Sequence, residues 1–413
     1  MPVSATTTLH RLGWAFALIP VVGACLWFLT GDLDDERNRS PIDLTQLVEL
    51  AILFVAVRAG LGRGFVLSSL TRPERWALAI LATCWCLGLI LSAPEPLAGV
   101  ERTAMRLPPL GAGIGLCFLL SRAGVEAAGG FPRFFMWQPL LHIPVVVLLL
   151  LVFLDEPRLN WLGGPVGFWH VRVWGVVIAA GVAAAVGLHA ARWRPGWRSD
   201  AVLFAGVLVL GTLLAWSGSR SAMLGLGLAY LVMVGVVRGP MLRGVVPAIA
   251  GLGLGVVISL TLPLPDNNYG LVSSITESQD ADLNRSSGGR LTLWTGTLDH
   301  VLDKPLIGHG FDQFRYVYKG EPEGTIQPHN AVLQLFFDFG LIGGSAAILL
   351  LLSLWWRAVG DCTTPGREWK LPAVMVLNTM AVTALFDGSL YHAEPLALIA
   401  LSLGILLSQP KPA

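Results

Sequence analysis

Two arginines lie at the starts of apolar segments and could bind a phosphorylated group. Arg220 follows a short polar hairpin at 216–219 and opens the next apolar segment, with Ser219 as its candidate N-cap. Arg290 follows a Ser-Gly-Gly run, whose glycines allow the backbone to approach a ligand closely. The first N–H groups of a helix and a guanidinium both attract anions, so each position is a candidate phosphate site.

Each arginine also has an ordinary interpretation. Arg220 could be a membrane-edge arginine whose stem covers apolar surface while its head reaches water. Arg290 could be a solvated loop residue or the ion-pair partner of Asp282. Neither position is specific to an anion site on its own.

Two histidines complete the set of candidate reactive groups. His329 lies where a long polar segment meets an apolar one, and Asn330 after it can cap the following helix. An imidazole with a reference pKa of about 6.5 can accept a proton near neutral pH, which suits a general base. His392, between the last two apolar segments, is a second candidate for contact with a sugar or a phosphate. The alternative for both is a structural polar residue.

An acid-rich segment at 31–37 is a competing site. Its carboxylates, Asp32, Asp34, Asp35 and Glu36, could hold Mg²⁺ or Mn²⁺ as hard oxygen ligands. A solvated turn balanced by Arg37 and Arg39 is the interpretation that we favour. We therefore expect neither a metal nor a cofactor.

The elements that carry these residues are predicted to be membrane helices. The chain of 413 residues is 54% hydrophobic and only 13% charged, whereas soluble domains are roughly 25% charged. The net charge of +1 excludes a strongly polyanion-binding protein on bulk charge, so no nucleic-acid partner is expected. A membrane helix needs about 20 apolar residues. This predicts an all-α polytopic membrane protein with about twelve spans, at 12–30, 42–58, 75–93, 103–121, 134–154, 169–190, 200–217, 219–237, 243–262, 330–356, 370–387 and 393–409.

The charge distribution predicts the orientation of these spans. With the N-terminus inside, the cytoplasmic segments carry sixteen Lys and Arg residues against five acids, as the positive-inside rule requires. Both termini are then cytoplasmic, and the first span is expected to be a retained signal anchor. The five scattered cysteines offer no disulfide outside the membrane.

Three regions follow from this topology. Residues 1–262 carry spans one to nine, 263–329 form a large periplasmic loop, and 330–413 carry spans ten to twelve. The loop contains a short amphipathic helix that begins near Arg290. Its expected bundle-facing residues, which recur at helical spacing, are Leu291, Trp294, Leu298 and Val301.

Three motifs in the second half of the chain resemble a known family. They are Lys-Pro-Leu-Ile-Gly-His-Gly-Phe at 304–311, His-Asn at 329–330 and Gly-Leu-Ile-Gly at 340–343. This pattern is similar to the signature region of the O-antigen ligase and polymerase superfamily, and within it to the O-antigen ligases. The residues that follow His-Asn, Ala331 and Val332, depart from the polar or aromatic residue often found there.

The resemblance implies a metal-independent glycosyltransferase of the GT-C type. Such a protein moves O-antigen from undecaprenyl pyrophosphate to the lipid A core, with inversion, at the periplasmic face of the bacterial inner membrane. Its partners would be the lipid-linked O-antigen, the lipid A core and membrane lipids. The resemblance assigns His329 as the catalytic base and Arg220 and Arg290 as pyrophosphate ligands.

Other functions remain open at the level of sequence. An O-antigen polymerase or a protein O-oligosaccharyltransferase would use the same donor and similar residues. A lipid-linked glycan transporter would place ionisable groups at mid-membrane, where Glu49 is the main acid. A scaffold protein would not require Arg220, Arg290 and His329 to converge.

Overall fold

The computed structural model describes residues 5–30, 43–154, 159–161, 170–191, 196–237, 239–279, 289–321 and 324–410. All regular secondary structure in these ranges is helical, without a β-strand. Seven of the described helical segments are long and apolar enough to cross a membrane, or up to eight if the bent pair α1 and α2 forms one span. The chain is therefore a polytopic α-helical membrane protein.

The helices of the first half precede residue 154. They are α1 (Ala5–Ala17), α2 (Ile19–Thr30), α3 (Leu44–Arg58), α4 (Arg63–Ser69), α5 (Arg72–Leu91), α6 (Pro96–Arg122), α7 (Val125–Gly130), α8 (Phe134–Leu140) and α9 (His142–Phe153). A short 3₁₀ helix, η1 (Phe131–Arg133), joins α7 to α8.

The second half carries the remaining helices. They are α10 (Val171–Ala191), α11 (Trp197–Trp216), α12 (Arg220–Val237), α13 (Gly239–Arg243), α14 (Val245–Ser259), α15 (Leu271–Gln279), α17 (Arg290–Asp303), α18 (Phe314–Val317), α19 (Ala331–Cys362), η3 (Glu368–Lys370), α20 (Leu371–Thr383) and α21 (Ala393–Leu407). Each predicted span overlaps one or two of these helices. The total of twelve spans remains a prediction, because several of them are shorter than a membrane span.

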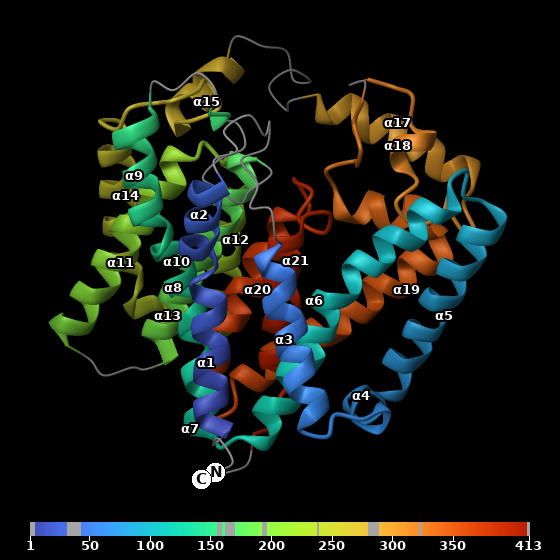
Figure 1. The fold of residues 1–413 in the computed structure, drawn as a ribbon, viewed down its shortest axis with the longest axis horizontal. Helices are drawn as coiled ribbons and strands as arrows, with labels where there is room; N and C mark the ends of the chain where they lie inside the picture. Colours follow the sequence, from blue (N-terminus) through green and yellow to red (C-terminus); the bar gives the residue numbers. More distant parts are fainter. Residues whose placement is uncertain are drawn as a thin grey trace.

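Helix α10 is the centre of one half of the bundle. Almost all its residues are buried, and it packs against α8, α11, α12 and α20. Its many glycines and alanines allow this close packing; a Cβ at Gly181, for example, would lie 2.3 Å from Pro139 Cγ. Helices α11 and α14 lie on one side of the bundle, and α5 and α19 lie on the other (Figure 1).

The two ends of the bundle differ. Helices α15, α17 and α18 lie at one end, called here the loop end (Figure 1). The opposite end carries α7 and the start of α1, and the chain returns to it where Gln409 N–H donates to Ser121 Oγ over 3.0 Å. We call this the terminal end.

A break in α19 explains the glycine motifs. Gly340 has φ 66° and ψ −175°, so the helical hydrogen bonds are interrupted there. The 305–310 segment packs into the break so closely that a Cβ at Gly308 would lie 2.5 Å from Gly340 N. It also replaces the lost backbone bonds, as buried backbone requires. These bonds are Leu341 N to Pro305 O (2.6 Å), Ile342 N to Leu306 O (3.4 Å), His309 N to Phe337 O (2.8 Å) and Gly310 N to Asp338 O (3.1 Å).

Helix α17 exists as predicted, but its predicted buried face is partly wrong. Leu293, Thr297 and Val301 are buried, whereas Leu291 and Leu298 are 42% and 48% exposed. The reason is tertiary: the helix leans on α19, and Leu293 and Val301 join a cluster with Phe314, Tyr318 and Phe337. All five cysteines are free.

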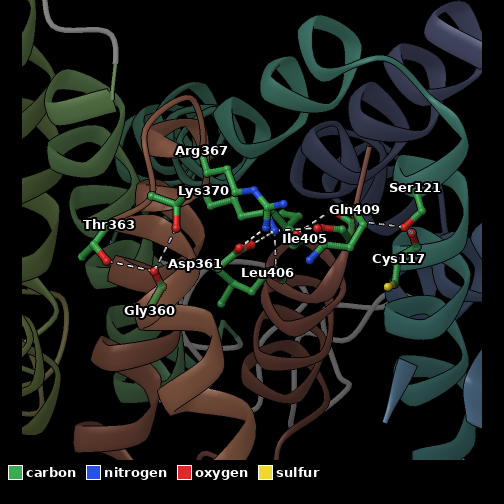
Figure 2. A network of polar contacts seen from close by, with 12 residues as sticks. Cys117, Ser121, Gly360, Asp361, Thr363, Arg367, Lys370, Ile405, Leu406 and Gln409 are labelled. Atoms are coloured by element: carbon green, nitrogen blue, oxygen red, sulfur yellow. Dashed lines mark hydrogen bonds and ion pairs between the residues drawn. The ribbon is translucent and has the colours of Figure 1, made fainter. Parts of the chain in front are cut away.

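At the terminal end, a buried lysine holds the C-terminal helix. Lys370 Nζ donates to the carbonyl oxygens of Leu406 (2.8 Å) and Ser408 (2.7 Å) and to Asp361, which also pairs with Arg367 (Figure 2). These carbonyls lie in and just after the last turn of α21, where helical partners run out. The lysine thus anchors the end of α21 to the α19–α20 connection.

Candidate active site

Asp387 is the buried centre of the polar groups at the loop end. It lies in the turn between α20 and α21, and its side chain accepts from Ser221 Oγ at 3.2 Å and from Gly388 N at 2.7 Å. Burial alone raises the pKa of this carboxyl. His329, Arg290 and the Gly388 N–H oppose burial and hold the Asp387 pKa below its ordinary value. Asp387 is therefore an anion at neutral pH.

His329 lies directly beside this carboxylate. Its Nδ1 is 3.5 Å from Asp387 Oδ1, and its side chain is 36% exposed. The backbone at His329 has φ 51°, which non-glycine residues rarely adopt. Two bonds hold it there: Trp294 Nε1 of α17 donates to Pro328 O (3.0 Å), and Ala331 N of α19 donates to the O of Ala384, which follows α20 (2.8 Å). With Nδ1 turned to Asp387, Nε2 is the nitrogen left to meet a substrate.

Asn330 has a structural role that accounts for its side chain. Its Oδ1 accepts from Val332 N (3.0 Å) and Leu333 N (3.1 Å), which caps α19 as the sequence predicts. This cap fixes the start of the helix immediately after His329.

The two predicted arginines lie near the same carboxylate. Arg290 is the first residue of α17, after Gly289 in the left-handed conformation (φ 75°). Burial lowers the Arg290 pKa, and repulsion from Arg172 and Arg220 lowers it further. The negative charge of Asp387 acts in the opposite direction and raises it. Arg220 is the first residue of α12, next to Ser221, which donates to Asp387. The starts of α12, α17 and α19 thus meet around Asp387.

The predicted cap by Ser219 is wrong. Its Oγ is buried and has no hydrogen-bond partner among the described residues. The cause is the tight packing of the 217–219 hairpin on α10, where a Cβ at Gly175 would lie 2.6 Å from Ser219 Cβ. The Ser219 hydroxyl is therefore left beside Arg220 rather than turned into the helix end.

Two further histidines border the site. His392 precedes α21, and burial lowers its pKa to about 4. His329 and Arg106 also lower this pKa, whereas Asp387 raises it. His170 precedes α10, and burial lowers its pKa to about 4 as well, with Arg172 assisting. Both side chains are neutral at pH 7. His392, which the sequence predicts as a second candidate for substrate contact, thus lies close enough to interact with His329.

Asp387 is a functional candidate that the sequence motifs do not indicate. Asp387 stands 58 positions after His329, and no spacing rule connects them. The sequence feature that could have indicated Asp387 is an acid followed by Gly388 after an apolar segment. This combination also fits an ordinary turn.

The other candidate site, the carboxylates of 31–37, lies outside the described residues. Within the part of the chain that the structure describes, no group of three or more His, Cys, Asp or Glu side chains could hold a metal ion.

The chemistry of the arrangement is that of displacement at a phosphorylated carbon. An imidazole oriented by a carboxylate can remove a proton from a hydroxyl. Two guanidiniums at helix starts can stabilise the charge of a departing phosphate. A membrane-embedded protein with these groups at one end of its bundle suits a substrate held in the lipid.

Comparison with known proteins finds similarity to O-antigen ligases. Residues 205–348 match the O-antigen ligase family model. The O-antigen ligase of Pseudomonas aeruginosa strain PAO1 is 28% identical over 209 residues, which cover 49% of this chain and 45% of that relative. The chain thus matches less than half the length of this relative.

These findings confirm the resemblance to the O-antigen ligase superfamily that the motifs indicate. The matched segment contains Arg220, Arg290 and His329, whereas Asp387 and His392 lie beyond it.

Proposed function

We propose that this protein is an O-antigen ligase, a glycosyltransferase of lipopolysaccharide assembly. It transfers O-antigen polysaccharide from undecaprenyl pyrophosphate to a sugar hydroxyl of the lipid A core. The reaction takes place at the periplasmic face of the bacterial inner membrane, which corresponds to the loop end of the bundle. Both termini are cytoplasmic in this topology.

His329 is the general base of the proposed reaction. It removes the proton of the acceptor hydroxyl, whose oxygen attacks the anomeric carbon of the O-antigen while the bond to the pyrophosphate oxygen breaks. Asp387 orients the imidazole and stabilises its protonated form, so it is a positioning residue. A single displacement of this kind inverts the anomeric configuration.

Arg220 and Arg290 bind the pyrophosphate and stabilise the charge that develops as it leaves. Arginines remain charged at any working pH and present forked donors that match phosphate oxygens. They can therefore serve where other lipid-linked glycosyltransferases use a divalent cation, and the proposal needs neither a metal nor a cofactor. The fold is then a GT-C type bundle of twelve spans, divided into 1–262, the periplasmic loop 263–329 and 330–413.

One observation carries the proposal: helices α12, α17 and α19 begin around a single carboxylate, with Arg220, Arg290 and His329 at or next to their first residues. A transporter would require its ionisable groups along a path through the membrane. Here the groups gather at one end, and their types match the needs of glycosyl transfer.

Reconstitution tests the proposal. The purified protein is placed in lipid nanodiscs with undecaprenyl-pyrophosphate glycan and lipid A core, and the products are separated by gel electrophoresis. A larger, core-linked product is expected, with activity retained in EDTA. A longer lipid-linked chain would identify a polymerase instead, and transfer to an added protein acceptor would identify a protein O-oligosaccharyltransferase. NMR of the new linkage should show inversion, and retention would contradict the single displacement.

A further inference from the structure

A second group of arginines lies at the loop end, around the ring of Tyr391. The Cζ atoms of Arg102, Arg106 and Arg315 are 5.9, 5.4 and 6.0 Å from the ring centre. Arg102 and Arg106 come from α6, and Arg315 comes from α18. Like charges gathered this closely repel one another, so the cluster needs anions close by.

One carboxylate is in direct contact with this cluster. Asp312, in the left-handed conformation with φ 58°, has its Oδ2 3.4 Å from Arg102 Nε and 3.7 Å from an Arg315 amino group. Glu394 acts on Arg106 by charge, and the exposed Glu101 acts on Asp312. Screening by solvent weakens the contribution of Glu101.

The arginines retain donors for a further partner. Arg106 donates to the Tyr391 carbonyl oxygen, Arg315 donates to the Tyr391 hydroxyl, and the buried Nε of Arg315 has no hydrogen-bond partner among the described residues. Each guanidinium offers five N–H donors. The side chains of Arg102 and Arg315 are 35% and 27% exposed, so an external group can reach them.

The cluster adjoins the candidate active site through one turn. Tyr391 N–H donates to Gly388 O over 2.8 Å, which keeps the two Cα atoms within about 7 Å. Asp387, which precedes Gly388, pairs with His329. His392 is affected by the charges of Asp387, His329 and Arg106, so it lies between the two groups.

The cluster is nevertheless separate from the arginines assigned to the donor. The charges acting on Arg290 belong to Asp387, Arg172 and Arg220. Those acting on Arg106 belong to Asp312, Arg102 and Glu394. The two groups of arginines therefore interact with different sets of charges near the His329–Asp387 pair.

We propose that Arg102, Arg106 and Arg315 bind a phosphate group carried by the acceptor saccharide and thereby direct its hydroxyl to His329. Forked guanidiniums match phosphate oxygens in geometry and charge. A phosphate held one short turn from Asp387 leaves a neighbouring sugar within reach of His329. This inference rests on the proposed function, because it names a feature of the acceptor in that reaction.

The test compares two forms of the acceptor. Transfer kinetics are measured in phosphatidylcholine nanodiscs with lipid A core as isolated and after phosphatase treatment. Wild-type protein should show a higher KM for the treated core. Arg315→Gln and Arg102→Gln should each raise the KM for untreated core about 10-fold or more, the effect of losing a charge-assisted hydrogen bond. Neither variant should change the KM for treated core or for the donor.

Matched variants control for charge and folding. Lys319→Gln removes a positive charge from an exposed position at the same end and should behave as wild type. Arg315→Lys should recover part of the affinity for untreated core. If Arg315→Gln aggregates during purification, Arg102→Gln gives the same comparison, because its side chain is the more exposed of the two.

Four results would overturn the inference. An equal KM increase for both acceptor forms would mean that the cluster only supports the turn. An increased KM for the donor would assign the arginines to the pyrophosphate. A defect seen only in phosphatidylglycerol nanodiscs would assign them to a lipid headgroup, and unchanged kinetics would remove any binding role. Absence of transfer by the wild-type protein, in contrast, would refute the proposed function itself.

Discussion

Lys370 and Asp387 are buried charged residues at opposite ends of α20, and their surroundings differ. Lys370 Nζ donates to Asp361 and to the carbonyls of Leu406 and Ser408 (Figure 2), which uses all three donors of an ammonium. Asp387 faces His329 at 3.5 Å, and His329 Nδ1 has no well-formed hydrogen bond among the described residues. One network is closed, whereas the other keeps unsatisfied donors.

The difference separates a structural use of buried charge from a chemical one. A fully bonded buried charge fixes the geometry of its neighbours and has no capacity left for a ligand. Buried polar atoms without partners need a specific explanation, and those at the loop end include Ser219 Oγ and Arg315 Nε. We infer that substrate groups satisfy these atoms in the proposed reaction.

The largest expected effect is on catalysis at the loop end. His329→Ala should lower kcat roughly 10²- to 10⁴-fold, the usual contribution of a positioned base. Asp387→Asn should also lower kcat strongly, because the amide cannot stabilise a protonated imidazole. The measurement is transfer by purified variants in nanodiscs, with size-exclusion profiles to confirm folding.

Two control variants make this comparison specific. His10→Ala makes the same change at an exposed histidine of the terminal end and should leave kcat unchanged. Asp361→Asn makes the same change as Asp387→Asn in the closed network. A kcat loss in Asp361→Asn equal to that in Asp387→Asn would show that the two carboxylates do not differ in role.

The next largest effect is on stability at the terminal end. Lys370→Met keeps the length of the side chain but removes its charge, so Asp361 loses a partner and two carbonyls at the end of α21 lose their donor. Removing one partner of a buried ion pair lowers the free energy of unfolding by roughly 3–5 kcal/mol. The thermal unfolding temperature in detergent should fall by several degrees, while kcat of the folded fraction is retained.

Lys319→Met is the matched control for this variant because Lys319 is exposed. Its unfolding temperature should equal that of the wild type. If Lys370→Met instead unfolds like the wild type but transfers slowly, the Lys370 network acts on the chemistry and the division between the two ends fails.

Local signals in the sequence predicted much of the architecture. Apolar segments of membrane length and the starts of α12, α17 and α19 depend on residues close together in the chain, so Arg220, Arg290 and the Asn330 cap could be placed. The glycine motifs were recognised as a family pattern. Their physical reason, a loop that fills the break at Gly340, required the structure.

The missed features depend on contacts between distant segments. The pairing of His329 with Asp387 follows from the bond between Ala331 N and Ala384 O, which joins α19 to α20. The buried face of α17 is decided by Phe337 on α19 rather than by the periodicity of α17 itself. Ser219 fails to cap because α10 occupies the space around it.

The smallest expected effect is a pH dependence of stability that originates at the loop end. Burial lowers the pKa of His392 to about 4, whereas an unfolded histidine has a pKa of about 6.5. Between these values the unfolded chain binds more protons, so stability is complete above about pH 6.5 and falls as the pH drops towards 4. From pH 7 to pH 5.5 the loss from His392 should be about 1 kcal/mol.

His392→Gln, which cannot take up a proton, should reduce this loss, as measured by thermal unfolding at pH 7 and pH 5.5. His170, whose pKa burial also lowers to about 4, keeps part of the dependence in the variant. His10→Gln, at an exposed histidine, should leave the wild-type slope in place. If His392→Gln loses as much stability as wild type on acidification, folding does not lower the pKa of His392. The loop end would then gain a positive charge beside His329 as the pH falls through about 6.5.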